Sequence, residues 1–122
     1  MRRLNRHPGL VLIAVAAAAV AYATAAPRAA SERVVQITAS RYTYSPDKIT
    51  LKRSEPVVLE FRTSDRKHGF KLAAFDVRAD IEPGDVARVR IVPYKVGTFV
   101  FACDDFCGSG HEDMDGTIVV TE

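Results

Sequence analysis

The sequence predicts an all-β domain, a small antiparallel sandwich or barrel built from about seven short strands. Two observations support this fold class. Apolar and polar residues alternate with a period of two in several short segments, and turn-forming residues separate those segments. No stretch after residue 33 keeps the 3.6-residue period of an amphipathic helix over three turns. The chain of 122 residues is long enough for one such domain with a modest core.

The alternation is clearest in PVVLEFRT, where the apolar Val57, Leu59 and Phe61 occupy one face and the other face carries Glu60 and Arg62. VARVRIV follows the same rule, and VVQITA is rich in β-branched residues. Turn signals are EPGD (82–85) and PYKVG (93–97). The expected extended segments, in order, are VVQITA (34–39), two short pieces of RYTYSPDKITL on either side of a turn at 45–47, PVVLEFRT (56–63), HGFKLAAFDV (68–77) and VRADI, VARVRIV (86–92), GTFVFAC (97–103) and TIVVT (117–121).

The N-terminal segment has the layout of an export signal. Arg2, Arg3 and Arg6 precede an apolar run from about Leu10 to Tyr22, and small-residue Ala-x-Ala patterns follow. Residues 1–26 are therefore expected to be either a signal peptide or an uncleaved membrane anchor, 27–33 a linker, and 34–122 the folded domain. In both cases the domain lies outside the cytoplasm, in the periplasm or on the outer face of the cytoplasmic membrane.

The charge balance excludes one class of partner. Residues 27–122 carry 14 Lys and Arg against 15 Asp and Glu, a net charge of −1, so the basic character of the whole chain belongs to its leader. No basic patch with interleaved aromatic residues is present, and nucleic-acid binding is not expected. The chain also has no serine nucleophile motif or carboxylate pair in an obvious acid–base role, so it is not expected to be a catalyst by itself.

Both cysteines lie in ACDDFCGSGHEDMDG, where Cys103, Cys107, His111 and Met114 follow the spacing C-x3-C-x3-H-x2-M. This loop is open to three interpretations: a disulfide or redox-active dithiol, a metal site, or an acidic surface turn. Thiolate, imidazole and thioether are ligands that favour copper. A second imidazole would come from His68, because His7 belongs to the leader.

Two thiolates four residues apart could bridge two copper ions that each receive one imidazole. Met114 would then complete the coordination of one ion and a backbone carbonyl between the cysteines that of the other, so the two ions would have different weak ligands. A rigid site rich in thiolate changes little when it gains an electron, which suits electron transfer.

The segment GTFVFACDDFCGSGHEDMDGTIVV resembles the binuclear copper (CuA) segment of cytochrome c oxidase subunit II. Every fixed position of the pattern C-x-x-x-C-G-x-x-H-x-x-M-x-G is met. SDRKHGF resembles the segment around that family's first histidine ligand, with Asp65 at an acidic position, and PVVLEFRTSD and IEPGDVARVRI also look like family strands. The similarity covers roughly residues 40–122 and is closest to the short bacterial subunit II with one anchor. Nitrous-oxide reductase carries the same copper module.

The resemblance implies a cupredoxin-like Greek-key fold and a CuA-type centre of two copper ions. Cys103 and Cys107 would bridge the ions, His68 and His111 would bind one ion each, and the weak ligands would be Met114 and the Asp105 carbonyl. It also implies electron transfer from a cytochrome c or small copper protein to the catalytic subunit of a haem-copper oxidase, with the N-terminal segment as a link to the membrane.

The chain departs from the family at particular positions. Asp105 stands where Glu or Gln is typical, Arg66 where an apolar residue is usual, and the chain has no tryptophan, although many members have one where the electron donor docks. A periplasmic copper chaperone or storage protein is therefore an alternative, and a thiol–disulfide redox protein is another. Five carboxylates are either simply solvated or form a negative rim for a basic partner: Asp104, Asp105, Glu112, Asp113 and Asp115.

Overall fold

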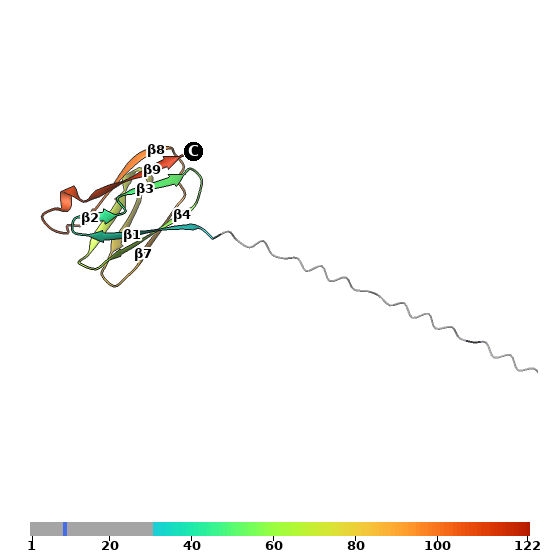
Figure 1. Cartoon of the computed structure of the whole chain (residues 1–122), viewed down its shortest axis with the longest axis horizontal. Helices are drawn as coiled ribbons and strands as arrows, with labels where there is room; N and C mark the ends of the chain where they lie inside the picture. The colour runs from blue at the N-terminus through green and yellow to red at the C-terminus, as the bar shows by residue number, and fades with distance from the viewer. Residues whose placement is uncertain (1–8, 10–30) are drawn as a thin grey trace, which may run out of the picture.

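A computed structural model describes residue 9 and residues 31–122, which form a two-layer β-sandwich of nine strands (Figure 1). This confirms the predicted all-β class. The predicted leader (1–26), apart from residue 9, and residues 27–30 of the predicted linker lie outside the described residues. Within the described part of the chain, no helix has the length and apolar character needed to span a membrane.

The first sheet has four strands in the order β2-β1-β4-β7. β1 pairs with β2 and β4 with β7 in antiparallel fashion, but β1 and β4 are parallel, with Ile37 opposite Phe61. The strands are β1 (Arg33–Ser40), β2 (Thr43–Ser45), β4 (Val57–Thr63) and β7 (Ala87–Ile91).

The second sheet has five strands in the order β3-β9-β8-β5-β6, with β3 and β9 parallel and the other pairs antiparallel. The strands are β3 (Lys48–Lys52), β5 (His68–Leu72), β6 (Val77–Ile81), β8 (Gly97–Ala102) and β9 (Asp115–Thr121). Two short 3-10 turns, η1 (Ala73–Phe75) and η2 (His111–Asp113), interrupt the connections.

Two details differ from the prediction. The sandwich is not purely antiparallel, because the chain changes sheets and β1 and β3 each pair with a later strand, β4 and β9, that runs in the same direction. The expected segment HGFKLAAFDV (68–77) is not extended throughout, because the chain reverses within it to form a hairpin with VRADI. The turn η1 and Asp76, whose φ is 52°, reverse the chain so that Leu72 pairs with Val77.

The core lies between the sheets and follows the predicted alternation. Val57, Leu59 and Phe61 are all at most 2% exposed, whereas on the opposite face Arg62 is exposed. Glu60 on that face is buried and pairs with Arg62 and Arg88. Phe61 continues a chain of ring contacts from one sheet into the other, because its ring centroid lies 4.5 Å from that of Phe70. The same chain extends to Phe101 and Tyr44 at centroid distances of 5.3 and 5.0 Å. This packed centre gives the loops at the sandwich ends a rigid base.

One end of the sandwich gathers the residues that the sequence singled out. β4 ends there, β5 begins there with His68, and the loop 103–114 connects β8 to β9 at that same end. Figure 1 shows this loop, in orange and red, at the end of the sandwich opposite the C-terminus. A hydrogen bond from Cys103 N to Met114 O (3.1 Å) closes the base of the loop and continues the β8–β9 ladder.

Candidate metal site

His68 is fully buried at the first position of β5, and one of its ring nitrogens has a partner. Its Nε2 lies 2.7 Å from Asp65 Oδ1, while its Nδ1 is buried and has no hydrogen-bond partner among the described residues. A buried polar atom without a partner costs free energy unless something else binds it. The orientation of the ring therefore leaves one nitrogen free to act as a ligand.

The two cysteines are buried beside this histidine as free thiols. Their Sγ atoms lie 3.7 Å apart, too far for a disulfide, whose sulfurs are about 2.05 Å apart. A ring nitrogen of His68 and the two Sγ atoms all lie within 4.8 Å of one another. Gly69 N–H donates a hydrogen bond to Cys103 Sγ at 3.3 Å, which fixes this sulfur against β5.

The thiol of Cys107 is not activated in the way that redox-active cysteines are. Burial raises its pKa to about 11, and the neighbouring Cys103 thiol adds to the rise. Reactive dithiols depend on a lowered thiol pKa, from nearby cations or a helix N-terminus. The structure thus disfavours the interpretation of the loop as a thiol–disulfide redox motif.

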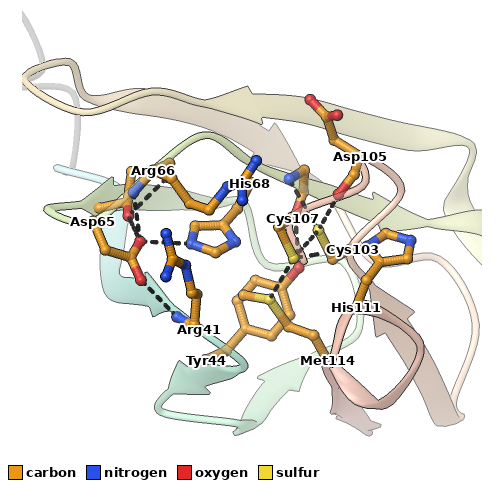
Figure 2. Close-up of polar contacts among 12 residues, drawn as sticks. Arg41, Tyr44, Asp65, Arg66, His68, Cys103, Asp105, Cys107, His111 and Met114 are labelled. Atoms are coloured by element: carbon orange, nitrogen blue, oxygen red, sulfur yellow. Dashed lines mark hydrogen bonds and ion pairs between the residues drawn. The ribbon is translucent and has the colours of Figure 1, made fainter. Parts of the chain in front are cut away.

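The other three predicted residues lie around the same two sulfurs (Figure 2). His111 Nδ1 is 3.7 Å from Cys107 Sγ, and the fully buried Met114 places its Sδ 3.8 Å from that atom. The backbone carbonyl of Asp105 lies 3.1 Å from Cys103 Sγ. All six predicted residues therefore form one cluster, with two thiols in the centre and two imidazoles, a thioether and a carbonyl around them. This soft donor set, with an unpartnered imidazole nitrogen, fits copper.

Asp65 holds the His68 ring from behind, a role that sequence reasoning did not assign. Burial opposes ionisation of this carboxyl, but hydrogen bonds from Arg41 N, the His68 ring, Thr63 Oγ1 and Arg66 N outweigh it and keep its pKa below the ordinary range. Carboxylates that orient a metal-binding histidine commonly occupy this position. The signal in the sequence was the short spacing D-x-x-H.

Gly69 and Tyr44 complete the support of Cys103. Tyr44 Oη donates a 2.6 Å hydrogen bond to Gly69 O. A Cβ atom at Gly69 would lie 2.0 Å from Asp104 Oδ1 and 3.0 Å from Asp105 N, so a glycine is required for the cysteine loop to approach β5 this closely. Nothing in the local sequence pattern indicated this contact, because it joins residues about 35 positions apart.

The acidic loop is partly neutralised from the neighbouring strands. Arg78 binds Asp104 through two hydrogen bonds, of 2.7 and 3.0 Å, and Lys67 Nζ lies 3.2 Å from Asp105 Oδ2. Among the described residues no ion pair is formed by Glu112, Asp113 or Asp115. Within this loop the unpaired negative charge therefore lies after His111, and the side chain of Asp105 pairs with a lysine.

Comparisons with known proteins agree with this fold and donor set. The model of the cupredoxin-like domain family matches residues 11–120. Cytochrome c oxidase subunit 2 of Thermus thermophilus is 30% identical over 92 residues, which make up 75% of this chain and 68% of that protein. The chain spans about half the length of other oxidase subunits that it matches, including a second T. thermophilus subunit 2 and a quinol oxidase subunit 2 of Sulfolobus acidocaldarius.

Solved structures show the same architecture. The periplasmic domain of subunit II of cytochrome oxidase from Bradyrhizobium japonicum superimposes with a TM-score of 0.69 at 19% identity, over 76% of this chain and 86% of that one. A copper binding protein solved in its apo form gives a TM-score of 0.60 at 27% identity, over 72% and 86% of the two chains. The chain belongs to the cupredoxin-like domain family, and within it to the group that includes subunit 2 of cytochrome c oxidases.

Proposed function

We propose that this protein transfers electrons through a binuclear copper centre of the CuA type. The observation that carries the proposal is the pair of buried free thiols, 3.7 Å apart, with a His68 ring nitrogen within 4.8 Å of both sulfurs and His111 Nδ1 3.7 Å from Cys107 Sγ. A mononuclear cupredoxin site requires one thiolate, so the second would be redundant there. A copper pair bound here would accept and release one electron.

The proposed ligands divide between the two ions. Cys103 and Cys107 would hold both ions, His68 would bind one and His111 the other, in keeping with the proximity of these four side chains. Met114 and the Asp105 carbonyl serve as unequal weak ligands. The support for two different weak ligands is that they lie on different sulfurs, the Met114 Sδ 3.8 Å from Cys107 Sγ and the Asp105 carbonyl 3.1 Å from Cys103 Sγ.

The proposed partners are a cytochrome c or small copper protein as electron donor and the catalytic subunit of a haem-copper oxidase as acceptor. The domain is exported to the periplasm or to the outer face of the cytoplasmic membrane. Support comes from the relatives named cytochrome c oxidase subunit 2 and from a solved subunit II domain described as periplasmic. On the chain itself, Phe106 is 72% exposed next to His111, at a ring-centroid distance of 5.7 Å, and unpaired carboxylates follow. An apolar tip beside negative charge suits a donor with a basic, partly apolar docking face.

Reconstitution with copper tests the proposal. We expect two copper ions per chain and an EPR signal in which one unpaired electron is shared by two copper nuclei. Binding of a single ion with a four-line spectrum would contradict the binuclear centre.

Replacing one bridging thiolate gives a second test. Cys103→Ser is expected to reduce the copper content to about one ion per chain and to give a mononuclear spectrum, because oxygen of a serine is a poor copper bridge. Copper content and EPR would be measured on the same sample. Thr98→Ser, at an exposed position, is a matched control and is expected to leave the copper content and the EPR spectrum unchanged.

A copper chaperone or storage role is a second candidate. The specific observation in its favour is the similarity to a protein described only as copper binding. Tight binding of Cu(I), fast transfer to an apo-oxidase and no fast electron exchange with cytochrome c would favour that role over electron transfer.

A further inference from the structure

The two-residue turn between β1 and β2 lies next to both loops that carry the candidate histidine ligands. Ser40 pairs with Thr43 across this turn, which leaves Arg41 and Tyr42 at its tip. Arg41 contacts the His68 side of the site through its backbone N–H, and Tyr42 contacts the His111 side through its ring. Neither belongs to the six residues of the cluster, and no sequence pattern connects them to it.

Arg41 reaches the His68 side of the site through its backbone. Its N–H donates a 2.7 Å hydrogen bond to Asp65 Oδ2, and the other carboxylate oxygen lies 2.7 Å from His68 Nε2. Oδ1 is further fixed by Thr63 Oγ1 at 2.9 Å. The direction in which the His68 ring presents its free nitrogen thus depends on where this turn holds the carboxylate (Figure 2).

Tyr42 reaches the His111 side through its ring. A Cβ atom at Gly110 would lie 2.3 Å from Tyr42 Cδ2, and one at Gly108 would lie 2.4 Å from Tyr42 Oη. The ring therefore packs directly on the backbone of this segment. His111 N–H donates to Gly108 O at 3.1 Å, and Asp113 N–H donates to Gly110 O at 3.2 Å. The two peptide groups beneath the ring are those that build the turn η2 and hold His111 in it.

We propose that the Arg41–Tyr42 turn is a positioning element for both imidazoles of the metal site. The Tyr42 ring fixes the position of the 108–111 segment and hence of His111. The Arg41 amide fixes the orientation of the Asp65 carboxylate and hence of the His68 ring. Because one turn supports both, a shift of the turn displaces the two imidazoles together relative to the thiols. Its role in tuning copper rests on the proposed function above, whereas its effect on the position of His111 is a property of the apoprotein.

The test compares Tyr42→Ala with Tyr42→Phe in the full chain, and with Tyr94→Ala as a control. Tyr94 is a 65% exposed tyrosine in the connection between β7 and β8, at the end of β8 away from the cysteines. In the apoprotein, Tyr42→Ala is expected to speed amide hydrogen exchange at His111 and Asp113 about tenfold, because the segment opens locally without its ring contact. Tyr42→Phe keeps the ring and is expected to restore protection, and Tyr94→Ala is expected to change neither amide.

Gly110→Ala supplies the reciprocal test. Its methyl group would clash with the Tyr42 ring, so this variant alone is expected to shift the NMR signals of His111, and Gly110→Ala with Tyr42→Ala is expected to bring them back toward wild type. Unchanged exchange in Tyr42→Ala, or a double variant no closer to wild type than Gly110→Ala, would overturn the proposal. EPR of copper-loaded Tyr42→Ala should show altered copper hyperfine couplings that Tyr42→Phe restores. If the wild type gives no binuclear signal, the copper function fails while the apoprotein result on positioning stands.

Discussion

At the scale of single residues, the site depends on groups that prepare others for binding. His68 has one nitrogen held by Asp65 and the other left free, and Cys103 accepts a hydrogen bond from Gly69 N–H. Each contact fixes an orientation before any metal arrives, which lowers the entropy that binding must overcome. Asp65 and Gly69, which support the proposed ligands, therefore matter as much as those ligands for the geometry of the cluster.

Asp65 should make the stability of the apoprotein depend on acidity. Its pKa is lower in the folded protein than in the unfolded chain, so its contribution is complete above the unfolded value of about 3.9 and is lost as the pH falls below it. Asp65→Asn removes this charge and is expected to lower the free energy of unfolding by about 1 kcal/mol at neutral pH. The loss should shrink towards pH 2.

Urea denaturation of the apoprotein between pH 2 and 7 measures this effect. Glu55→Gln, a neutralisation of an exposed carboxylate in the β3–β4 connection, is the control and should leave the curve unchanged. An Asp65→Asn variant whose stability difference is the same at every pH would contradict the assignment.

At the scale of elements, the cysteine loop is held against its neighbours from two sides. The β5–β6 hairpin contributes Arg78, which binds Asp104 through two hydrogen bonds, and the β1–β2 turn contributes the Tyr42 ring to the glycine segment. The loop has little regular structure of its own, so its shape depends on these contacts. Loops held in this way on a rigid sandwich are common places for binding sites.

Arg78→Lys should loosen the loop without greatly changing overall stability. Lysine keeps the charge but cannot form the two-pronged contact with Asp104, and pairs exposed to solvent contribute little to folding. We expect severalfold faster amide exchange at Asp104 and Asp105 with an unchanged unfolding midpoint. Arg53→Lys, at a pair near the C-terminus, is the matched control. A large fall in the midpoint would show that the pair supports the whole fold instead.

At the scale of the whole molecule, the site and the acidic residues of the cysteine loop share one end of the sandwich. Residues 27–122 are close to neutral overall, so any steering of a partner must come from local charge. Within the cysteine loop and its junction with β9, the carboxylates that form no ion pair among the described residues follow His111, whose ring lies beside the exposed Phe106. A docking partner would therefore approach the His111 side of the cluster.

The docking proposal predicts that electron transfer from a basic cytochrome c slows as salt is added. Neutralising two carboxylates after His111 with Glu112→Gln and Asp113→Asn should lower the second-order rate constant at low ionic strength by about threefold to tenfold. It should also make the rate constant less dependent on salt. Stopped-flow absorbance with the copper-loaded protein measures both. Glu55→Gln, at the far end of the sandwich, is the control. An equal effect from this variant would contradict docking beside His111.

The candidate site could be predicted largely because four of its residues lie within one short loop. The spacing from Cys103 to Met114 already contains the donor chemistry, and a two-residue alternation is enough to indicate strands. His68 was assigned by elimination and by resemblance, and the structure brings it to the thiols. Copper binding by these residues stays a prediction.

The sequence by itself determined the all-β class, the core face of β4 and the set of residues that gather at the site, because periodicity and spacing are local properties. Only the tertiary structure decided the parallel pairs β1–β4 and β3–β9, the hairpin at 68–81, and the contacts of Asp65, Gly69 and Tyr42. These features join segments far apart in the chain. The free energy that selects them comes from the packing of the two sheets against each other. A local sequence pattern carries no information about that packing.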